Sequence, residues 1–127
     1  MKNKNSILVK CFHCANLILV IFYLYPGSIL GHIFYGDTSI QPQITKDFLI
    51  SSNHFYAFIV LSIIGILAYH NTIKIDFLIN YLFLSSITLE FFHIFIPNRS
   101  FEVSDLFGNI MGVVVVFIIY KIKQKYE

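Results

Sequence analysis

Four long runs of hydrophobic residues follow one another along the chain, separated by short segments of polar and turn-forming residues. The runs cover residues 6–25, 54–70, 76–96 and 103–122. An α-helix rises about 1.5 Å per residue, so roughly 20 residues are enough to cross the hydrocarbon core of a bilayer, about 30 Å thick. The pattern therefore predicts an all-α membrane protein, a bundle of four transmembrane helices that forms a single domain over residues 1–127.

The segment between the first and second runs is less regular. Pro26 and Gly27 end the first run because they break a helix, and further glycine and proline residues mark turns as far as Pro42. Short apolar pieces within the segment favour contact with the membrane, but their periodicity is too weak to predict a helix. We expect an interfacial loop here. The first run is too long for a signal peptide and no small-residue cleavage site follows it, so we expect it to stay in the mature protein.

The later connections are short, with residues 70–74 between the second and third runs and residues 97–102 between the third and fourth. Short connections force neighbouring helices to run antiparallel. We therefore expect an up-and-down bundle against which the first helix packs.

Composition agrees with a membrane location, because 57% of the residues are hydrophobic and only 13% are charged, against about 25% charged in soluble domains. The cations also predict an orientation. With the N-terminus inside, only Lys46 and Arg99 fall on the outer side. Seven lysines fall on the cytoplasmic side: Lys2, Lys4, Lys10, Lys74, Lys121, Lys123 and Lys125. The positive-inside rule then places both termini in the cytoplasm. Clusters at helix ends, rather than along an exposed face, argue against a nucleic-acid partner.

Cys11 and Cys14 form a C-x-x-C pair near the start of the first run. One such pair lacks the four ligands of a structural zinc site, and Ala15 stands where haem attachment requires histidine. We expect two packing cysteines, since free cysteine behaves as a small hydrophobe.

Polar residues gather at one predicted depth, near the outer interface. The third run carries Glu90 and His93 in its outer third, just before Arg99, and His54 begins the second run at the same level. Ionisable groups within a membrane usually face the bundle interior and serve a function. We therefore expect Glu90 to lie within hydrogen-bonding reach of Arg99, His54 or Asn109.

The start of the fourth run contributes to the same level. Asp105, Asn109 and Gly112 share one helical face because they are four and seven residues apart. Gly108 and Gly112 form a small-xxx-small step that permits close helix packing. The candidate binding residues are thus Arg99, Glu90, Asp105, Asn109, His54 and His93.

Each of these residues also has a purely structural interpretation. Asp105 suits a helix N-terminus, Arg99 suits an anchor to headgroups, and Glu90 suits a structural pair with Arg99. Metal binding is a further alternative, because Glu90, His93, Asp105 and His54 all carry potential ligands. Arg99 in the same cluster would repel a cation, so we expect no metal and no cofactor.

The same residues resemble the pattern of the VanZ-like family of small bacterial membrane proteins. That pattern has Glu, Gln three residues on, Pro and Arg near the helix end, Asp opening the next helix, then Asn and Gly. In this chain the segment reads EFFHIFIPNRSFEVSDLFGNIMG, from Glu90 to Gly112. Upstream, the family's His with aromatic and small residues corresponds to the segment His54-Phe55-Tyr56-Ala57-Phe58, and the helix-ending Pro26-Gly27 also fits.

Two departures from the family pattern stand out. His93 replaces the usual Gln, which adds a titratable group, and Ile50-Ser51 stands where Asp-Lys is common. The resemblance covers residues 25–115, and the first helix is matched only by hydropathy. It implies a multi-pass protein of the bacterial cytoplasmic membrane with a role in the cell envelope. The family's namesake is associated with low-level teicoplanin resistance, which is not implied for this chain, and the family carries no agreed biochemical activity.

The leading functional hypothesis is an outward-facing polar pocket that binds an anionic lipid-linked headgroup. Arg99 would contact the phosphate through its planar donor fork, with Glu90 and Asp105 orienting it. One alternative is a membrane enzyme that uses Glu90, His93 or Asp105 as acid or base on an envelope lipid, and another is an oligomeric transporter. The expected partners are membrane lipids and a lipid-linked envelope precursor. The sequence leaves catalysis, substrate and oligomeric state open.

Overall fold

The computed structural model describes residues 2–47 and 49–127 and is all-helical over them. Four long helices, α1 (Lys2–Leu24), α3 (Ser52–Tyr69), α4 (Ile75–Phe92) and α5 (Val103–Tyr126), are each long and apolar enough to cross a membrane. A fifth, α2 (Ile29–Tyr35), is short. The predicted fold class, a bundle of four transmembrane helices, is confirmed.

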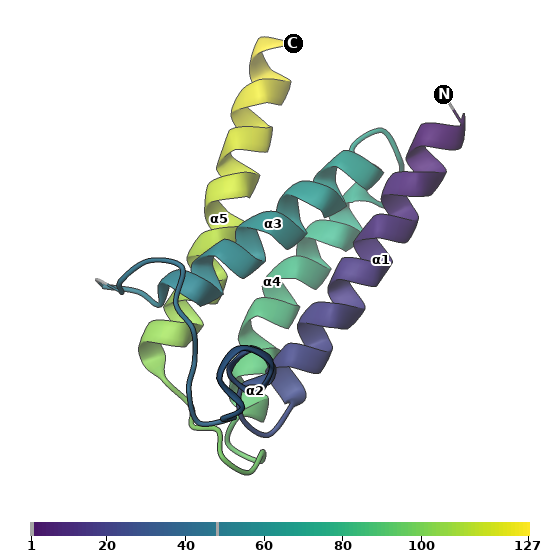
Figure 1. Ribbon diagram of the computed structural model, residues 1–127. Helices are drawn as coiled ribbons and strands as arrows, with labels where there is room; N and C mark the ends of the chain where they lie inside the picture. Colours follow the sequence, from purple (N-terminus) through teal and green to yellow (C-terminus); the bar gives the residue numbers. More distant parts are fainter. Residues whose placement is uncertain (1, 48) are drawn as a thin grey trace.

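The four long helices run alternately up and down, so the two termini lie at the same end of the bundle (Figure 1). The other end gathers the last residues of α1 and α4 and the first residues of α3 and α5. The six candidate binding residues named from the sequence therefore belong to the end remote from the termini.

Close packing of α3 on α5 brings these two helices together, and glycine makes it possible. A methyl group on Gly112 would lie 2.7 Å from the Phe55 carbonyl oxygen and 2.8 Å from the Phe58 Cβ. One on Gly108 would lie 2.7 Å from the Ser51 carbonyl oxygen. The small-xxx-small step thus seats the first turns of α3 directly on α5.

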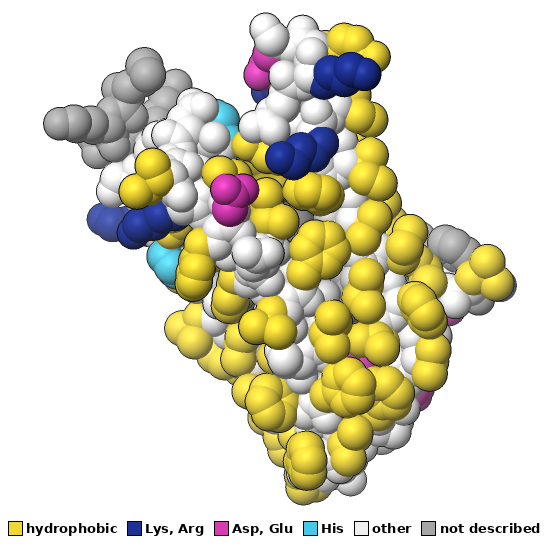
Figure 2. Space-filling model, turned by 180° about the vertical axis from the view of Figure 1, so that it is seen from behind, with side chains coloured by type: hydrophobic (Ala, Val, Ile, Leu, Met, Phe, Trp, Pro, Cys, Tyr) yellow, Lys and Arg dark blue, Asp and Glu magenta, His cyan; other side chains and the backbone are white. Residues whose placement is uncertain are grey.

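Hydrophobic side chains occupy both the inside and the outside of the bundle, as lipid surroundings permit. Phe58, Leu82 and Val113 are fully buried between the helices, whereas Leu84 on α4 and Ile119 on α5 are more than half exposed. Figure 2 shows one face covered with such side chains, and the cationic side chains visible on it gather at the end that carries the termini. The apolar exterior is the surface expected of helices whose solvent is hydrocarbon.

Cys11 and Cys14 are both exposed on α1. The expectation of two packing cysteines is wrong, because both side chains are exposed. A lipid-facing position is nevertheless apolar, which suits a thiol that behaves as a small hydrophobe.

The loop after α1 is more ordered than its weak periodicity predicted. The Ser28 hydroxyl accepts from the Gly31 amide at 2.9 Å and caps α2, while Gly36 ends this helix at φ 67°, in the left-handed region that favours glycine. Further along, the Asp47 carboxylate accepts from the Ser52 amide at 2.8 Å. These local caps fix the interfacial loop to the start of α3.

Helix α4 ends at Phe92, earlier than the predicted run to residue 96. From His93 onward the backbone forms tight turns, in which the amides of His93, Ile94 and Phe95 each bond to the carbonyl three residues before. Pro97 disfavours helical backbone at the residue before it, and Asn98 adopts a left-handed φ of 61°. This unwound end turns the chain toward α5 and positions Arg99 and Glu102.

Candidate functional site

Three side chains from three helices meet at the centre of the site. The Tyr23 hydroxyl, near the end of α1, lies 2.9 Å from His54 Nδ1 on α3 and donates a short hydrogen bond to Asn109 Oδ1 on α5. His54 Nδ1 is itself 3.0 Å from the same amide oxygen. The Asn109 amide nitrogen donates to the Ser86 carbonyl on α4 at 3.0 Å, which fixes the orientation of the amide.

This network determines which nitrogen of His54 carries its proton. The Asn109 amide oxygen can only accept, and the Tyr23 hydroxyl already donates to it, so Nδ1 must be the protonated donor. In the neutral ring Nε2 is then left with a free lone pair. Nε2 lies 3.5 Å from Asp105 Oδ2, one turn before Asn109 on α5.

Glu90 is fully buried, with one oxygen hydrogen-bonded and the other not. Its Oε1 accepts from the Glu102 backbone amide at 3.1 Å and lies 3.2 Å from His93 Nδ1. Its Oε2 has no hydrogen-bond partner within residues 2–47 and 49–127, and lies 3.8 Å from His54 Nδ1. A buried carboxylate oxygen without a partner is costly, so this atom needs an explanation.

His93 is held on both sides of its ring. It is almost completely buried, its Nδ1 faces Glu90, and its Nε2 lies 3.0 Å from the Tyr23 carbonyl oxygen. The ring also stacks on that of Tyr23, with 5.6 Å between centroids. Because both nitrogens have partners, His93 links the end of α4 to the end of α1 rather than offering a free ring nitrogen.

Arg99 caps the last turn of α1. Its Nη2 donates to the Phe22 carbonyl at 2.7 Å and its Nε to the Tyr25 carbonyl at 3.0 Å, carbonyls that a helix end leaves without intrahelical partners. Partial burial lowers the pKa of the guanidinium from its ordinary value, while nearby negative groups, Glu90 and Asp105 among them, act in the opposite direction.

Two of the expectations about this cluster are changed by these contacts. Glu90 faces the bundle, as expected, but its hydrogen bonds go to His93 and the Glu102 amide rather than to Arg99, His54 or Asn109. Two of the guanidinium nitrogens of Arg99 donate to carbonyls at the end of α1, so only part of the guanidinium is free to bind a ligand. Glu90 and Arg99 therefore do not form the expected structural pair: Glu90 bonds to His93 and the Glu102 amide, and Arg99 bonds to the end of α1.

One member of the cluster was missed in the sequence. Tyr23 is 7% exposed, and its hydroxyl, carbonyl and ring face contact Asn109, His54 and His93. Nothing in the hydropathy of the first run distinguishes it from the other aromatic residues there. Its place at the outer end of that run, at the depth of His54, was the available signal.

A search of family models provides an independent finding. The VanZ/LLP1 model matches residues 6–124 of this chain. The chain belongs to the VanZ/LLP1 family. No curated protein and no solved structure matches it. Its four apolar helices and this membership make it a multi-pass membrane protein of the VanZ/LLP1 family.

In this VanZ/LLP1 protein the residues of the resemblance occupy one small volume. His54, Glu90 and Asp105 each offer a metal-binding or proton-accepting atom, and these atoms all lie within 4.8 Å of one another. Asn109 holds His54 from the side. The side chains of His54 and Asp105 are 17% and 19% exposed, so these two residues form the partly exposed edge of the cluster, while Glu90 is buried.

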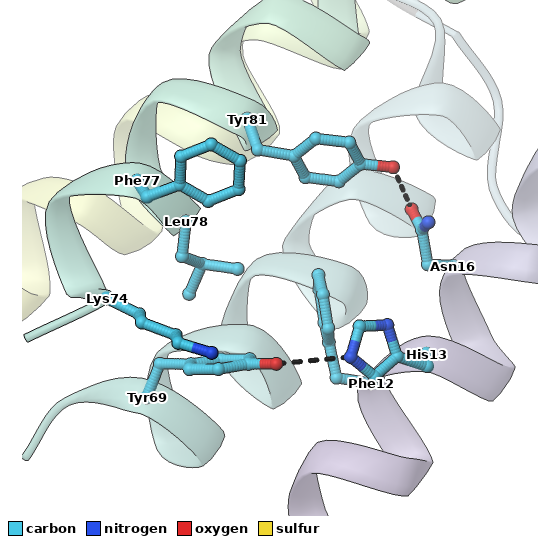
Figure 3. Close-up of a pocket in the computed structure, with 8 residues that line it drawn as sticks. All are labelled: Phe12, His13, Asn16, Tyr69, Lys74, Phe77, Leu78 and Tyr81. Carbon is cyan, nitrogen blue, oxygen red and sulfur yellow. Dashed lines mark hydrogen bonds between the residues drawn. The ribbon is translucent and has the colours of Figure 1, made fainter. Parts of the chain in front are cut away.

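A cavity lies away from this cluster, toward the end that carries the termini. It measures about 350 Å³ and lies between α1, the end of α3 and the start of α4 (Figure 3). Two hydrogen bonds cross it, from the Tyr81 hydroxyl to Asn16 at 2.8 Å and between His13 and the Tyr69 hydroxyl at 3.1 Å. His13, for which the sequence indicated no role, thus helps to attach α1 to α3.

Proposed function

We propose that this VanZ/LLP1 protein acts in the bacterial cell envelope and binds the headgroup of a lipid or lipid-linked precursor at the outer face of the cytoplasmic membrane. The orientation rests on the lysines, seven of which fall on the side of the termini while Lys46 and Arg99 fall on the other. With the termini in the cytoplasm, the site of Glu90, His54 and Asp105 faces the outer leaflet.

The observation that carries the proposal is the convergence of ionisable side chains from three helices at membrane depth. Glu90 is fully buried, and His54 and Asp105 form the partly exposed approach to it. Packing alone would be served as well by apolar residues, since measured polar contacts within membranes contribute on average only about 0.6 kcal/mol. Ionisable residues retained at this depth mark ligand sites.

The chemistry of the site defines the part of the headgroup that it suits. Asp105 and Glu90 accept hydrogen bonds and would receive hydroxyl or ammonium donors, whereas the part of the Arg99 fork not bound to α1 is the group suited to a phosphate. A headgroup that combines an anionic phosphate with sugar or amine donors satisfies both. The carboxylates alone would repel a bare anion.

Acid–base catalysis on the same lipid is the second candidate. It is favoured by the pairing of His54 Nε2 with Asp105 Oδ2 at 3.5 Å on the partly exposed side of the site, because an imidazole beside a carboxylate is a common general base. Formation of a product from the bound lipid would distinguish an enzyme from a protein that only binds the lipid.

Purification in a mild detergent, followed by mass spectrometry of the lipids that co-purify, tests the proposal. We expect one class of phosphate-containing lipid to be enriched over the membrane extract, and to be lost in Asp105→Asn and reduced in Arg99→Lys, because a point charge cannot reproduce the planar fork. Asp76→Asn, which changes an exposed carboxylate in the first turn of α4 at the other end of the bundle, is the matched control and should retain the lipid. Equal lipid content in all four proteins would refute the binding site. Conversion of the lipid by the parent but not by Asp105→Asn would favour the enzyme.

A further inference from the structure

Three potential ligand atoms of the site face one another without hydrogen bonds between them. His54 Nε2 and Asp105 Oδ2 are 3.5 Å apart, and Glu90 Oε2 is 3.8 Å from the other ring nitrogen, His54 Nδ1. One ligand atom from each of the three residues lies within 4.8 Å of the other two. The Glu90 oxygen is fully buried and has no hydrogen-bond partner in the part of the chain that the structure describes. A group that attracts all three atoms would account for this arrangement.

We infer that His54, Glu90 and Asp105 form a site for a divalent transition-metal cation. Ligands that each stand about 2.0–2.2 Å from a tetrahedral Zn²⁺ are themselves roughly 3.4 Å apart. The His54–Asp105 separation of 3.5 Å is close to this value, and the remaining pairs, within 4.8 Å of one another, would have to approach by at most about 1.4 Å.

The hydrogen bonds around His54 prepare its ring for this role. Nδ1 carries the proton and is held by Tyr23 and Asn109, which leaves the Nε2 lone pair directed toward Asp105. Metal-binding histidines typically donate their other ring N–H to a polar partner, which fixes the tautomer and the orientation of the ring. Glu90 is oriented in the same manner, because the Glu102 amide and His93 hold its other oxygen.

Charge and position also favour a cation. Two carboxylates at membrane depth are neutralised by one divalent ion, which removes the cost of keeping them ionised away from water. From the sequence, Arg99 was expected to repel a cation. In the structure its guanidinium donates to the Phe22 and Tyr25 carbonyls and is therefore directed at the end of α1. Its charge is partly compensated by these carbonyls.

The donor set selects the class of metal. One imidazole and two carboxylates suit Zn²⁺, Mn²⁺ or Fe²⁺, whereas Mg²⁺ and Ca²⁺ prefer six or more oxygen ligands. Three protein ligands leave at least one coordination position open, as in catalytic rather than structural zinc sites. The exposed edges of His54 and Asp105 direct that position toward the surface of the protein. This inference does not depend on the lipid proposal, because the three ligands belong to the protein alone.

The test is metal binding by the full-length protein in detergent, without added lipid and with a purification tag that lacks histidine. A Cys11→Ser, Cys14→Ser background removes the two exposed thiols that would otherwise bind zinc. After treatment with a chelator and addition of Zn²⁺ or Mn²⁺, elemental analysis should find about one ion per chain, and the melting temperature should rise. X-ray absorption at the zinc edge should report only nitrogen and oxygen ligands at about 2.0–2.2 Å.

Three variants connect the metal to these residues. Asp105→Asn and Glu90→Gln keep the shape of each side chain, and the side-chain amide oxygen that Glu90→Gln introduces would still accept from the Glu102 amide. Both variants should therefore fold and bind the ion at least about 10-fold more weakly. Asp76→Asn, which changes an exposed carboxylate in the first turn of α4 at the opposite end of the bundle, is the control and should bind like the parent.

Two results would overturn the inference: a parent protein that takes up neither Zn²⁺ nor Mn²⁺, or an Asp105→Asn protein with the parent's affinity. Should Glu90→Gln fail to fold, Asp105→Asn alone decides, because the Asp105 side chain is partly exposed. Lipid retention is measured separately, so loss of the lipid proposal leaves this result standing.

Discussion

Replacement of Gly112 by alanine should separate α3 from α5 and destabilise the bundle. The added methyl carbon would lie 2.7 Å from the Phe55 carbonyl oxygen, 2.8 Å from the Phe58 Cβ and 3.1 Å from the Ile59 amide nitrogen. Ordinary contact begins at 3.4 Å, so the nearest atom must move away by 3.4 − 2.7 = 0.7 Å. Two of the three atoms belong to the α3 backbone, so the whole helix must shift.

The expected magnitude follows from two opposing effects. Over-packing of this kind typically costs about 1–3 kcal/mol, while exchange of glycine for alanine within a helix returns about 1 kcal/mol. Because two of the three close contacts are with α3 backbone atoms, which cannot rotate away, we take the upper part of this range, about 2–3 kcal/mol, and expect a net loss of about 1–2 kcal/mol in the free energy of unfolding. Because the shift moves His54 relative to Asn109, ligand or metal binding should weaken as well.

Gly65→Ala provides the matched control on α3. Its methyl group would meet only the far ends of side chains, Phe12 Cε2 at 3.0 Å and the Leu78 methyls at 3.2 Å, which can rotate away. Equilibrium unfolding in mixed detergent and SDS micelles should show Gly65→Ala within about 1 kcal/mol of the parent and Gly112→Ala clearly below it. A Gly112→Ala protein as stable as Gly65→Ala would refute the argument from close helix packing.

Two further predictions concern orientation and the end of α1. In a background without Cys11 and Cys14, a cysteine at Ser100 should react with an impermeant thiol reagent on intact cells while one at Asn71 should be shielded, and the reverse pattern would overturn the proposed orientation. Arg99→Ala should lower the free energy of unfolding by about 1–3 kcal/mol, because it removes two charge-assisted hydrogen bonds to α1 carbonyls. Arg99→Lys should recover part of that loss, whereas an Arg99→Ala protein with the parent's unfolding curve would contradict the capping role.

Hydropathy and spacing predicted most of the framework. The apolar runs specified four spanning helices, because a continuous helix of this length satisfies its own backbone groups in hydrocarbon, and the part of the chain that the structure describes has four such helices. Polar residues confined to particular depths, such as Glu90 and Asp105, could be placed at one end of the bundle once antiparallel order was assumed. Gly108 and Gly112 also revealed their packing role, because small residues four apart have few other uses on a transmembrane helix.

The sequence could not supply the partners of these residues. It suggested that Glu90 and Arg99 meet, yet Glu90 bonds to His93 and the Glu102 amide, and Arg99 caps α1. Both outcomes depend on where α4 unwinds after Phe92, a point set by Pro97 and the following turn rather than by hydropathy. The same holds for Tyr23, whose role depends on the rotation of α1 about its own axis.

Length and hydrophobicity thus determined by themselves that the chain crosses a membrane four times, since burial of a helix in lipid depends on local composition and on nothing distant in the sequence. Only the tertiary structure decided that the imidazole of His54 stands between two carboxylates with its free nitrogen toward Asp105. The physical reason is that the lipid and the interior of the helix bundle are about equally apolar. Hydrophobic pattern therefore cannot define the inward face of a helix, and that face is set by close packing at glycine and by hydrogen bonds between helices.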